Sequence, residues 1–157
     1  MTPDEAERLL AQYRAGIDAQ LNLLRQLADI ARRQREVTAA ADFEAFGRVA
    51  DERDAIMRSI VTLEDGLRTL RQELTIHRDV ASQLDRYAEV VARHRDATDL
   101  VNAILSTDQQ SISALADAEL ARRSAMASLE RGESTLAAYR RVLSPPVSSA
   151  RLVDKIG

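Results

Sequence analysis

Apolar residues recur at steps of three and four along the first part of the chain, and in an α-helix this spacing puts them on one face. The face comprises Leu10, Tyr13, Ile17, Leu21, Leu24, Ala28 and Ala31. Thr2 and Glu5 have the spacing of a capping box, and Pro3 suits the first helical turn. The sequence predicts a helix from about Pro3 to Val37, in which only Gly16 is unfavourable, by about 1 kcal/mol relative to Ala.

A second apolar seam follows a weak break at residues 38–41. Asp42 is a favourable N-cap, and Glu44 adds negative charge to the first turn of the next helix. The following apolar positions have the seven-residue repeat of helices that pack at shallow angles. They are Phe46, Val49, Arg53, Ile56, Ile60, Leu63, Leu67, Leu70 and Leu74. Arg53 is the one polar member, and it either sets the register or extends its charged head to water.

Polar residues from 75 to 83 weaken this seam, and we expect the chain to reverse near His77–Ser82. Apolar positions then continue to Leu136 without a strong helix breaker. Two architectures fit this pattern: three helices with a long third, or four of similar length, because Ser106 and Thr107 could start another helix. Both are all-α antiparallel bundles of long amphipathic helices.

The dipeptide Pro145-Pro146 ends the helical pattern, because proline has no amide hydrogen to donate. We therefore expect a helical bundle domain over residues 1–143 and a flexible tail over residues 144–157. If the tail became a helical turn or two, three of its residues could form one apolar stripe, but the tail is too short to be a stable helix alone. The stripe comprises Leu152, Val153 and Ile156.

Composition narrows the class of protein. Hydrophobic residues make up 45% of the 157 and charged residues 30%, which indicates a globular chain. There is no cysteine, so disulfides and thiolate metal ligands are excluded, and the net charge of −3 lacks the basic surplus of a nucleic-acid-binding protein. No apolar run approaches the roughly 18 residues of a membrane span, and the N-terminus does not resemble a signal peptide. We expect a cytoplasmic protein.

Candidate catalytic chemistry is sparse. His77 and His94 lack the spacing of a metal-binding pair and are interpreted as structural or solvated. Carboxylates alternate with arginines, as in residues 51–54, which is typical of a solvated helix face. The sequence contains no Glu-x-x-His motif, glycine-rich phosphate loop or nucleophile elbow. We therefore expect a protein that is not an enzyme and binds no metal or cofactor.

Four stretches resemble FlgN-type flagellar export chaperones. Residues 39–46, with small residues, Asp and Glu, resemble the family's entry into its second helix, and residues 49–56 resemble the acidic–basic segment that follows. Residues 104–111 resemble a polar patch in the family's third helix, and residues 129–139 resemble the end of that helix.

This resemblance implies a function. FlgN-type proteins bind hook-associated subunits of the hook–filament junction in the cytoplasm, cover their aggregation-prone terminal helices and deliver them to the flagellar type III export gate. The related FliT-type chaperones do the same for the filament cap subunit. The resemblance also implies that the client binds toward the C-terminal helix and tail. The candidate client-binding residues there are Ile112, Leu115, Met126, Leu129, Leu136, Tyr139, Leu152, Val153 and Ile156.

An alternative function is a structural coiled-coil subunit, either a homodimeric scaffold or a component like the stalk of the export ATPase. A chaperone is expected to be a monomer or a weak homodimer, whereas a scaffold should be an obligate multimer whose stability depends on concentration. For each candidate residue on a helix, the competing interpretation is ordinary bundle core.

Overall fold

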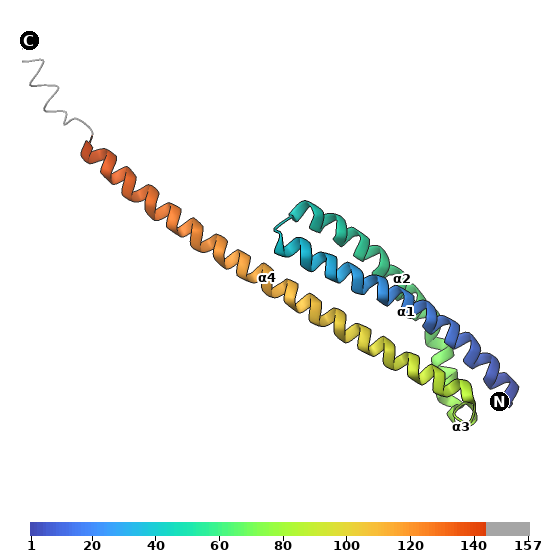
Figure 1. Ribbon diagram of the computed structural model, residues 1–157. Coiled ribbons are helices and arrows are strands. Elements are labelled where there is room, and N and C mark those ends of the chain that lie inside the picture. Colours follow the sequence, from blue (N-terminus) through green and yellow to red (C-terminus); the bar gives the residue numbers. More distant parts are fainter. Residues whose placement is uncertain (144–157) are drawn as a thin grey trace, which may run out of the picture. The chain divides into compact units, whose positions relative to one another are not determined.

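The computed structural model describes residues 1–143, and every regular element among them is a helix (Figure 1). The chain divides into two units, Met1–Ala114 and Leu115–Gly157. The helices are α1 (Pro3–Ala39), α2 (Phe43–Ile76), the short α3 (Arg78–Ala81) and α4 (Asp85–Leu143). The all-α prediction is confirmed. The three-helix arrangement with a long third helix is confirmed as well, and the four-helix alternative is wrong because α4 is continuous through Ser106 and Thr107.

The helix starts follow the capping chemistry of the sequence. The hydroxyl of Thr2 accepts the Glu5 N–H at 3.2 Å, and the Glu5 carboxylate accepts the Thr2 N–H at 2.8 Å, so the capping box is formed. Asp42 accepts the Ala45 N–H at 3.0 Å at the start of α2. Between α1 and α2 the chain turns through Ala41, whose φ of 54° is the left-handed conformation that alanine adopts at a cost of about 1 kcal/mol.

Helix α1 extends two residues beyond the expected end at Val37. The reason lies in Thr38, which is 9% exposed and donates its hydroxyl to the Gln34 carbonyl at 2.7 Å. Burial of this residue against the bundle favours another half-turn that the local sequence does not signal.

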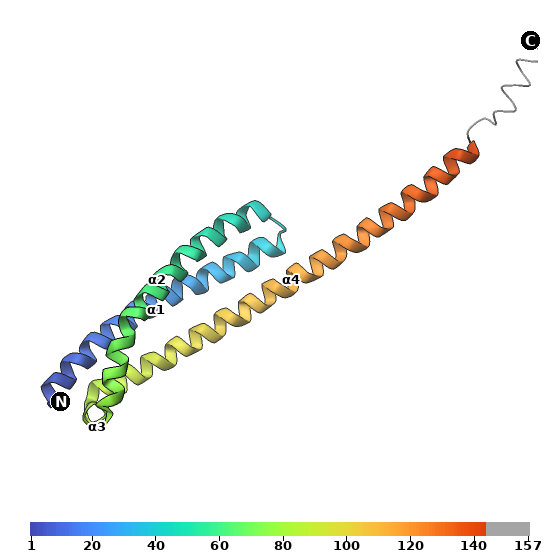
Figure 2. The ribbon, with the colours of Figure 1, turned by 180° about the vertical axis from the view of Figure 1, so that it is seen from behind.

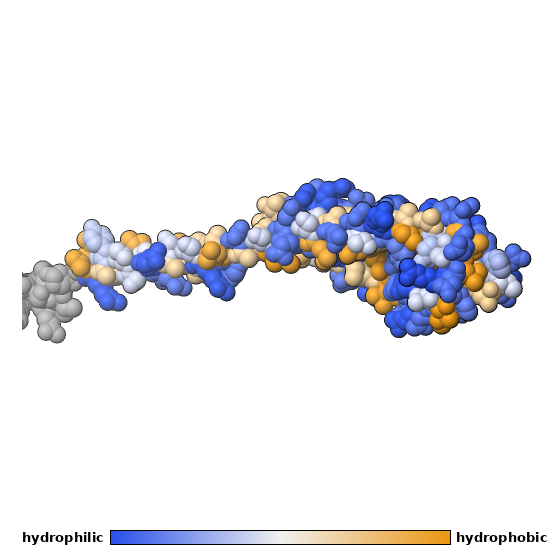
Figure 3. Space-filling view, turned by 90° about the horizontal axis from the view of Figure 1, so that it is seen from below, coloured by the Kyte–Doolittle hydropathy of each residue, from blue (hydrophilic) through white to orange (hydrophobic). Residues whose placement is uncertain are grey.

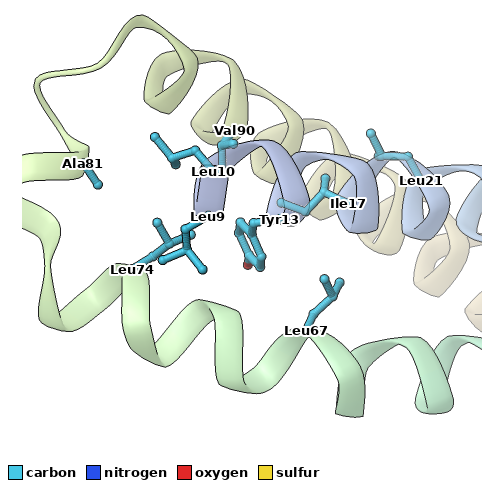
Figure 4. Close-up of a cluster of buried hydrophobic side chains, with 9 residues drawn as sticks. All are labelled: Leu9, Leu10, Tyr13, Ile17, Leu21, Leu67, Leu74, Ala81 and Val90. Carbon is cyan, nitrogen blue, oxygen red and sulfur yellow. The ribbon is translucent and has the colours of Figure 1, made fainter. Parts of the chain in front are cut away.

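The first unit is an antiparallel bundle of α1, α2 and the first part of α4. Figures 1 and 2 show α1 and α2 side by side, with α3 at the turn into α4, where the reversal near His77–Ser82 was expected. One buried cluster joins all four helices (Figure 4): Leu9, Leu10, Tyr13, Ile17, Leu21, Leu67, Leu74, Ala81 and Val90. A second cluster contains Leu24, Leu27, Ala31 and Ile104. Ion pairs between α1 and α4 flank this core: Glu7–Arg86, Arg14–Glu89 and Asp18–Arg93.

Candidate partner-binding surface

The described part of the second unit, residues 115–143, contains no buried residue. Its apolar side chains are open to solvent: Leu129 is 71% exposed and Leu136 is 68% exposed. Figure 3 shows hydrophobic side chains interspersed with hydrophilic ones along this unit. Soluble proteins rarely leave a long row of leucines uncovered, so this helix is the candidate partner-binding surface.

The exposed leucines of this unit follow a seven-residue repeat. One row consists of Leu115, Arg122, Leu129, Leu136 and Leu143, and a second row, three residues further along, consists of Ala118, Ala125, Gly132 and Tyr139. On an α-helix two such rows form one stripe, the a and d positions of a coiled coil. We call these nine residues the C-terminal seam.

The two rows of the C-terminal seam differ in size. Three of the four residues in the second row are small, and a shallow groove around Gly132 is lined by the neighbouring Leu129 and Leu136. A Cβ added at Gly132 would meet no heavy atom within 4 Å. Small residues beside leucines leave room for the side chains of a closely packed helix.

Charge in the middle of the seam is neutralised locally. Arg122 donates two hydrogen bonds of 2.9 Å to Glu119, and Arg123 donates a third of 3.0 Å. These bonds lower the pKa of Glu119 to about 2. Since the Arg122 guanidinium is bound to Glu119 one turn earlier, the aliphatic stem of Arg122 is the part that lies in the seam.

The structure brings some of the predicted client-binding residues together. Leu115, Leu129, Leu136 and Tyr139 belong to the seam, and Met126, 47% exposed, flanks it. All five are exposed, so the competing interpretation as bundle core is wrong for them.

Other predicted residues lie elsewhere. Ile112 is 59% exposed but belongs to the first unit. Leu152, Val153 and Ile156 lie outside the described residues.

Sequence reasoning missed part of the seam. Leu143, Ala118 and Ala125 were not singled out, although a spacing of seven from Leu115 reaches Leu143 and the positions three residues further along reach the two alanines. Two other exposed apolar residues, Leu120 at 68% and Val142 at 80%, lie outside both rows. They were also missed, because their spacing belongs to no repeat.

A part-buried cluster of polar side chains in the first unit connects three helices. The Tyr13 hydroxyl is 2.8 Å from Nε2 of His94, and Arg71 donates from Nε to the same hydroxyl at 2.9 Å. Arg71 also binds Glu64, at 3.0 Å from Nη2, and Gln20 donates to that carboxylate at 3.1 Å. Burial, and then the charge of Arg71, lowers the pKa of His94. This cluster satisfies the polar groups of the bundle interior, in agreement with a structural role for His94.

Among residues 1–143, no group of three or more His, Asp or Glu side chains is arranged to hold a metal ion. No described helix is both long and apolar enough to cross a membrane. No family model, curated protein or solved structure matches this chain. The resemblance to FlgN-type chaperones therefore rests on the sequence alone and stays a hypothesis.

Proposed function

We propose that this chain is a non-enzymatic helix-binding protein, and specifically a cytoplasmic export chaperone of the FlgN type. Its clients would be hook-associated or filament cap subunits of a flagellum. The observation that carries the helix-binding part is the exposed C-terminal seam, a row of leucines beside small residues. The flagellar part is supported by the sequence resemblance.

The physical basis is the packing of an amphipathic helix against a complementary apolar stripe. A client helix that lays its apolar face on Leu129 and Leu136 would remove both leucines and its own apolar face from water. If the client helix is disordered when free, the entropy of ordering it offsets part of this gain. Such a complex can protect an aggregation-prone segment and still release it at the export gate.

The test uses purified hook-associated and filament cap subunits encoded in the same genome, titrated calorimetrically into the full chain. The double variant Leu129→Glu, Leu136→Glu places two charges in the seam, and we expect it to weaken binding at least tenfold. Leu120→Glu is the matched control, because Leu120 is equally exposed and about 100° per residue of helix directs it away from both rows. The control should bind like the unmodified chain.

A second variant, truncated after Leu143, tests the predicted contribution of Leu152, Val153 and Ile156. Weaker binding by the truncated chain would support the tail as part of the site. If none of the flagellar subunits binds the full chain, the export-chaperone assignment is wrong. If they bind and the seam variant is unaffected, the client-binding surface lies elsewhere on the molecule.

A further inference from the structure

We propose that the C-terminal seam pairs with the same seam of a second copy of this chain, in antiparallel orientation. This proposal does not depend on the chaperone function, and a client helix that binds the seam would displace the second copy. It rests on three features of α4: the continuity of its seven-residue register, the alternation of large and small residues in the seam, and the placement of Arg122.

The second row of the C-terminal seam continues a row of α4 residues that is already packed in the core of the first unit. Val90 and Ile104 are 4% and 5% exposed, Ala97 packs partly buried between them, and Ser111 is 8% exposed. These residues are spaced by seven, and the same series continues as Ala118, Ala125, Gly132 and Tyr139. One position of the seven-residue repeat is therefore buried in the first half of α4 and exposed in the second half. This difference indicates that a partner covers the exposed half.

The kind of partner follows from the geometry of the repeat. On a straight α-helix a strict seven-residue repeat drifts by about 20° per heptad, so a long seam remains on one side only if the helix supercoils with another helix. The exposed seam spans Leu115 to Leu143, four complete heptads, which is long enough for a two-stranded coiled coil.

Residue sizes favour a second copy in antiparallel orientation. In that orientation the leucine row of one helix faces the small row of the other. With the two-fold axis between residues 130 and 131, three of the four layers join a large and a small side chain. These three layers are Ala118 with the partner's Leu143, Ala125 with the partner's Leu136, and Leu129 with the partner's Gly132. Because the pairing is symmetric, each layer occurs twice.

The charged residues agree with this arrangement. Arg122 faces the partner's Tyr139, so the aliphatic stem of Arg122 packs against the aromatic ring while its guanidinium stays bound to Glu119. At the flanking positions Glu119 lies opposite the partner's Arg140, so unlike charges face each other. Neither contact requires a charge to leave water completely.

A parallel pair would be poorly matched. Identical positions would then meet, so that Gly132 faces the partner's Gly132 and the two alanine layers leave voids, which forfeit packing energy. Arg122 would also face the partner's Arg122, and like charges repel. The sizes and charges of the seam residues therefore favour the antiparallel orientation.

Sedimentation velocity of the full chain over a hundredfold range of concentration tests the association. We expect a concentration-dependent monomer–dimer equilibrium that Gly132→Leu shifts at least tenfold toward monomer. Gly132 has open space in the monomer, so the added side chain does not disturb its own helix. Gly66→Leu is the matched control, since Gly66 is also helical with open space, and it should dimerise normally. A monomer at every concentration, or equal effects of the two variants, would overturn the proposal.

Cysteine cross-linking tests the orientation, because the chain has no cysteine of its own. A mixture of two single variants, Ala125→Cys and Leu136→Cys, should form a mixed disulfide dimer under mild oxidation. Ala125→Cys alone should form little. Efficient cross-linking of Ala125→Cys alone would show a parallel pair and contradict the antiparallel arrangement.

Discussion

Half-buried polar residues in the first unit are held in place by specific partners. His94 lies against Tyr13, which also binds Arg71, and Arg53 lies between Gln34 and Asp108. Arg53 donates to both oxygens of Asp108, at 2.7 and 2.6 Å, and to Gln34 at 2.7 Å. The polar member of the second seam therefore connects three helices, and its partner Asp108 stands in the same row of α4 as the leucines of the C-terminal seam.

We expect His94 to make the free energy of unfolding depend on pH. Burial and the neighbouring charge of Arg71 lower the pKa of His94 in the folded state, so the unfolded chain binds the proton more readily. The free energy of unfolding should therefore be highest above the ordinary histidine pKa of about 6.5 and fall as the pH drops below it. Urea unfolding at pH 7.5 and 5.5 measures this loss. The loss of unfolding free energy between the two pH values should be smaller in His94→Gln. An equal loss in that variant would show that His94 does not cause the pH dependence.

The Arg53–Asp108 pair should be sensitive to removal of one partner. Both side chains are 23% exposed, so Asp108→Ala leaves a largely desolvated guanidinium and should lower the free energy of unfolding by about 1–3 kcal/mol. The double variant Arg53→Met, Asp108→Leu should recover most of this loss, because it leaves no unpaired charge. Urea unfolding of the unmodified chain, Asp108→Ala and the double variant measures the loss and its recovery.

The control for this comparison is Glu52→Ala, which removes an exposed ion pair with Arg33 and should have little measurable effect. If Asp108→Ala is as mild as this control, the pair does not hold the helices together.

At the scale of helices, the close approach of α1 and α2 depends on Gly16. A Cβ at this position would overlap Cδ2 of Leu67 and lie 3.2 Å from its Cγ. Leu67 is 3% exposed and belongs to the main buried cluster, so it has little room to move. The helix-weakening glycine of the sequence is therefore a packing requirement between two helices.

Alanine substitutions separate the effect of glycine on helix propensity from its effect on packing between helices. Gly16→Ala gains about 1 kcal/mol of helix propensity but overpacks the core by about 1–3 kcal/mol, so the net effect should be destabilising. Gly66→Ala, where the added methyl meets open space, should be stabilising by up to about 1 kcal/mol. Thermal unfolding of both variants compares them directly, and a stabilising Gly16→Ala would contradict the close approach.

At the scale of the whole molecule, the two units differ in how they are stabilised. The first buries its apolar residues within one chain, whereas residues 115–143 bury none within the described structure. A fragment of residues 1–114 should therefore unfold cooperatively, with a free energy of unfolding within about 0.5 kcal/mol of the full chain. Urea unfolding by circular dichroism, at a concentration where the full chain is monomeric, measures both.

A shorter fragment, residues 1–103, serves as the contrasting case. It lacks Ile104, which is buried in the second cluster, and Asp108, the partner of Arg53. Its loss of stability should be about 2–5 kcal/mol or more. If removal of residues 115–157 is equally damaging, the second unit contributes to the stability of the bundle.

The sequence by itself determined the all-α class, the caps at Thr2 and Asp42, and the buried faces of α1 and α2, because capping and helical periodicity act between residues close in the chain. Only the tertiary structure decided that α4 is unbroken, that Gly16 faces Leu67, and that the leucines after residue 114 are exposed. The repeat on α4 is equally regular where it is buried and where it is open. Periodicity shows which face of a helix is apolar, whereas only the arrangement of the helices in space determines what covers that face.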